Sequence, residues 1–416
     1  MRRLYTLLLY LLLPYALFHL AWRGRKQPSY LQHIGERFGF YGKRPRQPLI
    51  WLHTVSVGET RAAASLVNAL LERYPDHRIL LTHMTPTGRE AGEALYGERV
   101  LRCYLPYDFP WAVRRFLRHF KPAVGLLMET EIWFNLIGEC RTAKVPLLLI
   151  NARLSEKSRK KFAKAPALTR EALSGLAAIA AQTRADAGRF KKLGAPSVEI
   201  MGNLKFDITP PEKMVKRGKA LRIDFGTTRP AFLAASTREG EEALLLDALP
   251  QFTTPNLLFV IVPRHPQRFN EVAQLLEARR ISFQRRSENR PIPPHIKVVL
   301  GDNMGELFAY YAACDLAYIG GSLLPLGGQN LIEAASVGTP ILIGPHTFNF
   351  SEASELAIQA GAALRVQDAA ELAKTATRLL ADPSSLSAMS QAGRAFSQHH
   401  RGATARLMAL ISTYLV

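Results

Sequence analysis

Residues 49–74 read LIWLHTVSVGETRAAASLVNALLERY, and they contain the unit from which the predicted fold is built. The apolar run LIWLH is followed by a polar loop that ends at Glu59, and then by a segment with the spacing of an amphipathic helix. Continuously apolar strands that alternate with helices are typical of parallel sheets covered on both faces. The stretch therefore predicts an α/β fold.

The same strand–loop–helix unit recurs along the chain. The other apolar runs that we expect to be strands are RILLT (78–82), VGLLM (124–128), PLLLI (146–150), AAIAA (177–181), VEIM (198–201), AFLAAS (231–236), LLFVIV (257–262), KVVLG (297–301), LAYIG (316–320) and PILIG (340–344). The two series, separated by a polar stretch, predict a two-domain α/β protein with a cleft between the domains. The expected division is a membrane anchor at 1–22, a domain at 23–208, a linker at 209–228 and a domain at 229–416.

The charge balance favours an anionic partner. The chain has 54 Lys and Arg residues against 34 Asp and Glu residues, which gives a formal net charge of +20. Its three cysteines, Cys103, Cys140 and Cys314, are far apart and lack metal-ligand spacing, so neither a disulfide framework nor a metal site is expected. No recognisable nucleic-acid module is present, so we do not expect nucleic acid to be the partner.

The N-terminus predicts contact with a membrane. Residues 4–22 carry no formal charge, and a run of this length can just cross a hydrocarbon core of about 30 Å. The run is too long for a signal peptide and lacks a small-x-small cleavage site, which favours an uncleaved anchor. Basic residues flank it on both sides, so spanning the membrane and lying in one leaflet both remain open. The basic segment 23–46, with Glu36 as its one acid, is expected to contact anionic lipid.

Glu59 allows two interpretations. With Ser56 it forms S-x-x-E, the pattern of a capping box at the start of a helix. It also occupies a loop after a strand, where parallel sheets bind ligands. Polar and glycine residues gather in the equivalent loops, which are METE (128–131), GNLKFD (202–207), ASTREGEE (235–242), PRHPQRF (263–269) and GDNMGE (301–306). This clustering favours a functional role for Glu59 in addition to capping.

The second half of the chain predicts a nucleotide site. In GGSLLPLGGQNLIEAASVGTP (320–340), Asn330 suits a helix N-cap, and Glu333 could accept hydrogen bonds from a ribose diol. The alternative is a glycine-rich turn with an acid that matches the helix dipole. Arg264 follows another strand and suits a phosphate. Walker, complete G-x-G-x-x-G and D-x-D motifs are missing from the sequence, which argues against an ATPase or dinucleotide enzyme and favours a metal-free mechanism.

Together these residues carry a family resemblance that covers nearly the whole chain. The motifs, in order, are RGRK, GERFGFY, VSVGE, MTPTG, LPYD, METEIW, NARLS, GNLKFD, PRHP, MGEL, GGQNLIE and GPHTFNF. The sequence resembles the lipid A-specific 3-deoxy-D-manno-octulosonic acid (Kdo) transferases. That resemblance implies the GT-B fold, in which two Rossmann-like domains with parallel sheets face each other across a cleft. It also implies CMP-Kdo as donor and, as acceptor, an acylated, bisphosphorylated glucosamine disaccharide, the lipid A precursor. It further implies the inner membrane, with the catalytic domains on the cytoplasmic side.

The resemblance also assigns roles to individual residues. It makes Glu59 the general base, and Glu129 and Lys205 the groups that stabilise the transition state. The residues expected to contact CMP are Pro263, Arg264, Met304, Gly305, Glu306, Asn330, Leu331, Ile332 and Glu333. No metal or other cofactor is implied. The sequence departs from the family where Gln329 replaces a usual His and Leu331 a frequent Pro, which puts a contact by that His in doubt.

The expected function is therefore inverting transfer of Kdo from CMP-Kdo to lipid IVA in lipopolysaccharide core biosynthesis. One carboxylate suffices for such a single displacement. One alternative is another membrane-associated GT-B enzyme that uses a different nucleotide sugar. The other is a protein that binds anionic lipid without chemistry, which would leave the gathering of Glu59, Lys205, Arg264 and Glu333 in ligand-binding loops unexplained.

Overall fold

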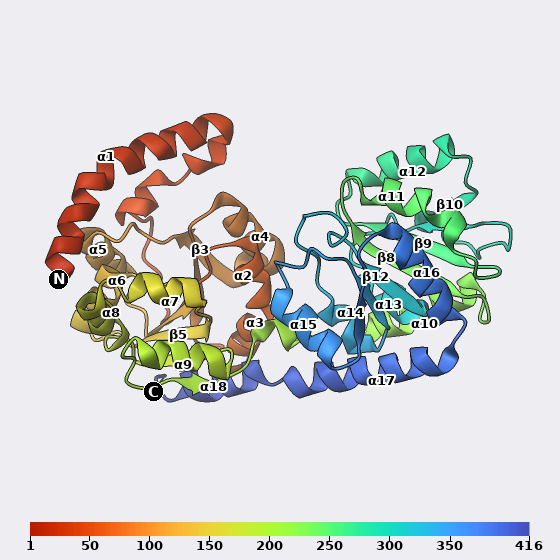
Figure 1. Cartoon of the computed structure of the whole chain (residues 1–416). Coiled ribbons are helices and arrows are strands. Elements are labelled where there is room, and N and C mark those ends of the chain that lie inside the picture. The colour runs from red at the N-terminus through yellow and green to blue at the C-terminus, as the bar shows by residue number, and fades with distance from the viewer. Residues whose placement is uncertain (416) are drawn as a thin grey trace. The chain divides into compact units, whose positions relative to one another are not determined.

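The structure is a computed structural model that describes residues 1–415. The chain forms two compact units. The first comprises Met1–Asp207 and the segment from Arg401 onward, and the second comprises Ile208–His400 (Figure 1). The chain therefore passes between the units twice, after Asp207 and after His400.

The first unit is built on a seven-stranded parallel sheet with the order β3-β2-β1-β4-β5-β6-β7. Its strands are β1 (Leu49–His53), β2 (Arg78–His83), β3 (Val100–Tyr104), β4 (Val124–Met128), β5 (Leu147–Ala152), β6 (Ala178–Ala181) and β7 (Glu199–Ile200). In β1 every residue is buried. Trp51 packs in the core on one face, and Ile50 and Leu52 pack in the core on the other, which explains why the strand is apolar throughout.

Helices cover both faces of this sheet. The helices of this unit are α1 (Arg2–Lys26), α2 (Val57–Ala62), α3 (Ala64–Arg73), α4 (Pro86–Tyr96), α5 (Pro110–Phe120), α6 (Phe134–Thr142), α7 (Glu156–Phe162), α8 (Pro166–Leu173), α9 (Arg184–Lys192) and α18 (Ala403–Ser412). The core on the Trp51 face includes residues of α5, α6, α8 and α9. The opposite core includes residues of α3 and α18. The layered architecture predicted from the sequence is confirmed.

The second unit repeats this plan, with the order β10-β11-β9-β8-β12-β13-β14. Its strands are parallel: β8 (Ala231–Thr237), β9 (Leu258–Pro263), β10 (Phe283–Arg285), β11 (Val298–Leu300), β12 (Leu316–Ile319), β13 (Ile341–Ile343) and β14 (Ala363–Arg365). Its helices are α10 (Glu212–Phe225), α11 (Glu241–Asp247), α12 (Arg268–Ala278), α13 (Leu307–Ala313), α14 (Ile332–Val337), α15 (Ser351–Gln359), α16 (Ala369–Leu380) and α17 (Pro383–His400). Residues of α11, α12, α16 and α17 share one core with the strands.

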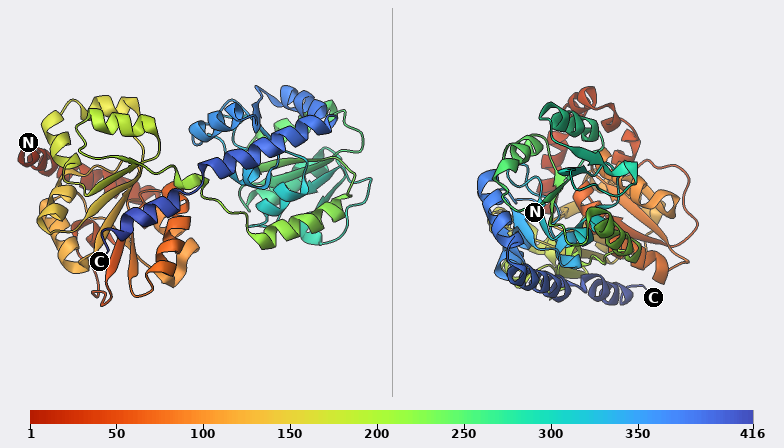
Figure 2. Two further views of the ribbon diagram at one scale, coloured as in Figure 1. Left: turned by 90° about the horizontal axis from the view of Figure 1, so that it is seen from below. Right: turned by 90° about the vertical axis from the view of Figure 1, so that its right-hand side faces the viewer.

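The division of the chain differs from the predicted one in two places. Most of the expected linker at 209–228 is α10, which packs closely on α13 because Gly218 has no side chain: a Cβ there would lie 2.5 Å from that of Ala312. The end of the expected C-terminal domain belongs instead to the first unit. Leu407 and Ile411 of α18 are fully buried in its core, and α18 lies beside α3 (Figures 1 and 2).

One carboxylate joins the two places where the chain crosses between the units. Asp207 is the last residue before the first crossing. Its side chain accepts hydrogen bonds from the amides of Gly402, at 2.6 Å, and Thr404, both just after the second crossing. Asp207 therefore caps α18 and ties that helix to the GNLKFD segment.

Candidate active site

The carboxyl ends of β1 and β4 lie side by side in the first sheet. The strand order reverses there, because β2 and β3 continue on one side of β1 and β5 to β7 continue beyond β4. In open parallel sheets, such a switch point is where ligands bind. Glu59 follows β1 and Glu129 follows β4, so the two predicted catalytic carboxylates both lie at this switch point.

The first turn of α2 fixes the Glu59 carboxylate. Its Oε2 accepts a hydrogen bond from the Val55 amide at 2.8 Å, and its Oε1 accepts one from the Ser56 hydroxyl at 2.9 Å. Ser56 is the N-cap of α2, and its Oγ accepts from the Glu59 amide at 3.4 Å. The predicted capping role is confirmed, although the glutamate bonds to the residue before the N-cap. Each carboxylate oxygen can accept two hydrogen bonds, so capping leaves lone pairs for a substrate proton.

The surroundings of Glu59 adjust its acidity. Burial raises the pKa of Glu59 from 4.5 to about 7, and the negative charges of Glu129 and Glu131 contribute to the rise. The hydrogen bonds from Val55 and Ser56 act in the opposite direction. A carboxylate that titrates near neutral pH can remove a proton from a substrate hydroxyl more effectively than an ordinary glutamate.

The METE loop supplies two further carboxylates. The backbone of Glu129 is left-handed, with φ of 60°, which is uncommon for a side chain of this kind and occurs preferentially at functional sites. Glu131 accepts a hydrogen bond from Trp133 Nε1 at 2.5 Å, and burial raises the pKa of Glu131. Glu131 is not among the predicted site residues, although METE itself contains this second acid.

Lys205 lies in a short 3-10 turn, η4 (Leu204–Phe206), after β7. The Asn203 side chain accepts from the Lys205 amide at 3.0 Å, and the Leu204 amide donates to Asn151 Oδ1 at the end of β5, also at 3.0 Å. The side chains of Leu204 and Phe206 are buried and hold the turn on the core. These contacts bring Lys205 back across β6 toward the end of β5, at the same edge of the sheet as the two glutamates.

Two other residues near this edge have structural roles. Glu36 forms an ion pair with Arg89 at 2.6 Å and accepts from the Tyr104 amide at 2.8 Å. His53 is fully buried and bonded through Nδ1 to Thr82, and burial lowers the pKa of His53 to about 3. The histidine is therefore neutral and a poor proton acceptor at neutral pH.

In the second unit, a buried glutamate that the sequence did not single out organises the glycine-rich loop. Glu241 begins α11, is fully buried and accepts a hydrogen bond from the Tyr318 hydroxyl at 2.5 Å. It also accepts from the amides of Gly321 at 2.5 Å, Ser322 at 3.1 Å and Leu323 at 3.2 Å. The loop after β8 is thus bonded to the loop after β12, at the switch point of the second sheet. In the sequence, Glu241 could have been found from the two acids that follow Gly240 in ASTREGEE.

Pro263 ends β9, and Arg264 follows it. The Arg264 amide donates to the Thr237 carbonyl at 2.9 Å, which fixes its backbone beside the end of β8. Burial raises the pKa of Tyr311, a fully buried residue of α13, while the charge of Glu333 adds to the rise and that of Arg264 opposes it. This shared neighbour places a cation suited to phosphate and a carboxylate suited to a ribose diol in one part of the second unit.

The predicted contacts at 304–306 divide into two kinds. The Glu306 carboxylate is buried and forms an ion pair with Arg217 at 2.5 Å, with Arg286 at 3.6 Å. Its side chain therefore has a structural role. Met304 is exposed, and Gly305 has φ of 82° with open space around its Cα. The backbone at 304 and 305 is accordingly accessible to a ligand.

The segment 330–333 departs from the predicted capping geometry. Leu331 is the N-cap of α14, and the Asn330 side chain accepts from the Ile332 amide at 3.0 Å while donating to Glu333 Oε1 at 3.1 Å. The side chains of Leu331 and Ile332 are buried. If these two residues contact a nucleotide, they do so through the backbone.

Similar solved structures agree on the fold. The UDP-GlcNAc 2-epimerase from Neisseria meningitidis is 16% identical, with a TM-score of 0.59 over 88% of this chain and 100% of that chain. The family model "Glycosyl transferases group 1" matches residues 232–396. A second model, "3-Deoxy-D-manno-octulosonic-acid transferase (kdotransferase)", matches residues 32–208.

Full-length relatives define the family. A 3-deoxy-D-manno-octulosonic acid transferase from Bordetella pertussis is 47% identical over 393 residues, or 91% of each chain. The corresponding enzyme from Haemophilus influenzae is 37% identical over 421 residues, which cover 100% of this chain and 99% of that one. The two parallel sheets and these matches define a glycosyltransferase of the GT-B fold. The chain belongs to the 3-deoxy-D-manno-octulosonic acid (Kdo) transferase family.

Proposed function

We propose that this Kdo transferase uses CMP-Kdo as donor and transfers Kdo, with inversion, to an acylated, bisphosphorylated glucosamine disaccharide, the lipid A precursor lipid IVA. The observation that carries the mechanism is a carboxylate at the switch point of the first sheet, Glu59, whose pKa burial raises to about 7. Membership of the Kdo transferase family supports Kdo as the transferred sugar, and the net charge of +20 suits a phosphorylated acceptor.

The proposed reaction is a single displacement. A hydroxyl oxygen of the acceptor attacks the anomeric carbon of Kdo, and Glu59 takes the hydroxyl proton as the new bond forms. The bond from the anomeric carbon to the CMP phosphate oxygen breaks, and CMP leaves with the electron pair. No second nucleophile is needed, because no glycosyl-enzyme intermediate forms.

The other predicted site residues balance the charges that develop. Positive charge grows on the anomeric carbon, where Glu129 can oppose it, and negative charge grows on the departing phosphate, where Lys205 and Arg264 can oppose it. Glu333 is suited to the ribose of CMP. These assignments use one group of residues from each unit.

We further propose that the enzyme works on the cytoplasmic face of the inner membrane. The described chain contains one helix, α1, that is long and apolar enough to cross a membrane. The acylated acceptor belongs to the membrane, and the basic segment 23–46 suits its phosphates and the surrounding anionic lipid. A CMP-sugar donor is a cytoplasmic metabolite, which sets the proposed orientation.

Transfer assays with different donors test this function. Purified protein should transfer Kdo from CMP-Kdo to lipid IVA, with inverted anomeric configuration in the product, at a rate that a metal chelator does not change. Mass spectrometry detects the added sugar, and NMR gives the configuration. Transfer from a UDP-sugar but not from CMP-Kdo would instead favour another GT-B activity. Binding of anionic vesicles with no transfer from any nucleotide sugar would indicate a lipid-binding protein.

A further inference from the structure

The N-terminal helix α1 presents two different faces along its length. Its inner face contacts the rest of the first unit, and the residues that are at least partly buried recur at helical spacing: Arg2, Tyr5, Thr6, Leu9, Leu13, Ala16, His19, Leu20 and Gly24. The rest of its surface is exposed and largely apolar, and includes Leu4, Leu7, Leu8, Tyr10, Leu11, Leu12, Tyr15, Leu17, Phe18 and Trp22. A helix that is apolar all round is usually buried or membrane-bound. Here protein covers one side only.

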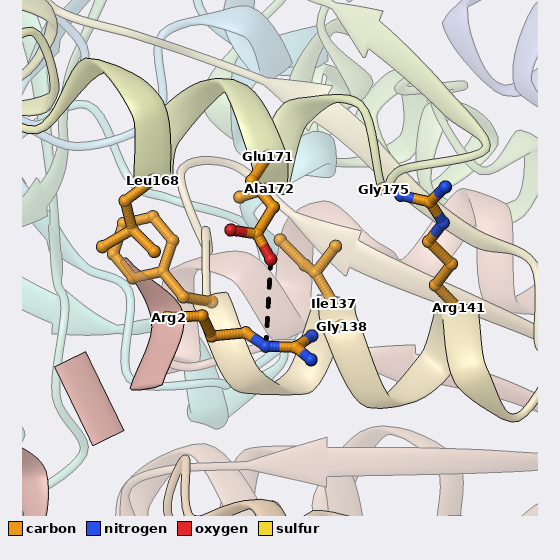
Figure 3. A pocket seen from close by; sticks show the side chains of 9 residues that line it. Arg2, Ile137, Gly138, Arg141, Leu168, Glu171, Ala172 and Gly175 are labelled. Atoms are coloured by element: carbon orange, nitrogen blue, oxygen red, sulfur yellow. Dashed lines mark ion pairs between the residues drawn. The ribbon is translucent and has the colours of Figure 1, made fainter. Parts of the chain in front are cut away.

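Arg2 docks the first turn of α1 on the body of the unit. Its side chain helps to line a small cavity of about 30 Å³ beside α6 and α8 (Figure 3). Arg2 Nε is 3.9 Å from the carboxylate of Glu171. The guanidinium packs so closely on Gly138 that a Cβ at that position would overlap it. The missing side chain at Gly138 therefore leaves the room that the arginine occupies.

Two further polar contacts hold the next residues of α1. The Tyr5 hydroxyl donates to Asp108 Oδ2 at 2.9 Å, and the Thr6 hydroxyl donates to Asn135 Oδ1 at 3.0 Å. Asp108 is itself buried and accepts the amide of Asn135 at 3.0 Å. Asp108 ends LPYD and Asn135 follows METEIW, so two motifs of the family build the receiving surface for the helix. One turn farther on, Tyr10 stacks on Phe109, with ring centroids 5.1 Å apart.

These contacts are incompatible with a helix that crosses the bilayer. A helix of 25 residues is about 38 Å long, so a spanning α1 would place its first turn on the far side of a hydrocarbon core of about 30 Å. Arg2, Tyr5 and Thr6 could not then reach Glu171, Asp108 and Asn135. The polar residues of the first turns are instead satisfied by the same unit that carries Glu59.

We infer that α1 lies along one leaflet of the membrane, docked on the first unit by its inner face and inserted into lipid by its outer face. Lipid is the occupant that fits the outer face, because its exposed apolar residues are flanked by exposed basic ones, Arg3 at one end and Arg23 and Arg25 at the other. Basic residues at both ends of an apolar face suit anionic headgroups at a single surface. This inference does not depend on the identity of the donor or acceptor.

Labelling at the two ends of the helix tests the orientation. Arg3→Cys and Arg25→Cys replace exposed residues, and the native cysteines Cys103, Cys140 and Cys314 are buried. In native membrane vesicles, a membrane-impermeant maleimide should label both positions from the same side of the membrane. That side is the one on which the catalytic units are exposed. Labelling of the two positions from opposite sides would show that α1 spans the membrane and would overturn the inference.

Cross-linking tests whether α1 stays docked on the first unit when the protein is in the membrane. A short bis-maleimide should link Tyr10→Cys to Phe109→Cys within one chain, whereas the matched pair Leu11→Cys and Phe109→Cys should link poorly because Leu11 is 68% exposed on the outer face. Equal linking of both pairs would contradict a fixed docking of the helix.

A fluorophore tests the occupant of the outer face. An environment-sensitive probe on Leu11→Cys should shift to shorter wavelength with phosphatidylglycerol-containing vesicles and be quenched by nitroxide-labelled lipid. A shift that depends on protein concentration and not on vesicles would indicate a second copy of the chain, and would overturn lipid as the occupant.

Discussion

Replacing Glu59 with glutamine is expected to lower the rate of Kdo transfer by about 10²–10⁴-fold, the usual contribution of a positioned general base. Glutamine has nearly the same shape and can still accept the hydrogen bond from the Val55 amide, but it cannot take a proton. Because Glu59 belongs to the first unit and the predicted CMP contacts belong to the second, CMP affinity should change little. The measurements are single-turnover transfer and calorimetric titration with CMP.

One control variant separates loss of the base from loss of the helix cap. Ser56→Ala removes the N-cap oxygen and keeps the carboxylate, so it should cost about 1 kcal/mol of stability and leave transfer within a few-fold. A Ser56→Ala variant as inactive as Glu59→Gln would contradict a catalytic role for Glu59 itself.

The pH dependence of stability shows whether the glutamine variant is properly folded. The folded-state pKa of Glu59 is raised from 4.5 to about 7, so its contribution to stability is fully present below about 4.5 and is lost as pH rises through about 7. Glutamine does not titrate. As the pH rises from about 4.5 to about 7, the melting temperature of the wild type should therefore fall relative to that of Glu59→Gln. Such a change would show that the variant is folded and that misfolding does not cause its inactivity.

Replacing Glu241 with alanine is expected to have the second largest effect, on stability and donor binding together. Each buried donor left without its acceptor costs about 1–3 kcal/mol, and Glu241 accepts from three backbone amides and the Tyr318 hydroxyl. The four contributions are not additive, but the free energy of unfolding is expected to fall by several kcal/mol. Since these amides shape the loop that begins at Gly320, CMP should bind at least tenfold more weakly.

The neighbouring acid Glu239 provides the matched control. It is an exposed residue paired with Arg238, so Glu239→Ala should change stability by less than about 0.5 kcal/mol. Thermal melting and CMP titration of the two variants make the comparison. Similar behaviour of Glu239→Ala and Glu241→Ala would show that Glu241 does not organise the loop.

The inner strands of both sheets could be predicted because burial on two faces requires apolar residues throughout. The strands that the sequence did not reveal, β3, β10 and β14, all lie at an edge of a sheet. Edge strands are covered on fewer sides and include polar residues, such as Arg102 in β3 and Arg365 in β14, which interrupt the apolar pattern. The closing helix α18 was missed as part of the first unit because nothing in its local pattern identifies the distant surface that buries Leu407.

The site was predictable to the extent that strand ends identify ligand loops. That principle selected the loops of Glu59, Glu129, Lys205 and Arg264. It could not show that the Glu306 carboxylate is paired with Arg217, nor that Glu241 is buried. Both facts depend on contacts between segments far apart in sequence, and neither changes the local pattern.

The most direct test of the central claim is the pH dependence of kcat/KM for Kdo transfer from CMP-Kdo to lipid IVA. The wild-type value should rise tenfold per pH unit and level off above about pH 7, the pKa to which burial raises Glu59. In Glu59→Gln this rise should disappear along with most of the rate. A profile that keeps the same rise in Glu59→Gln would contradict the account, because another group would then be the base.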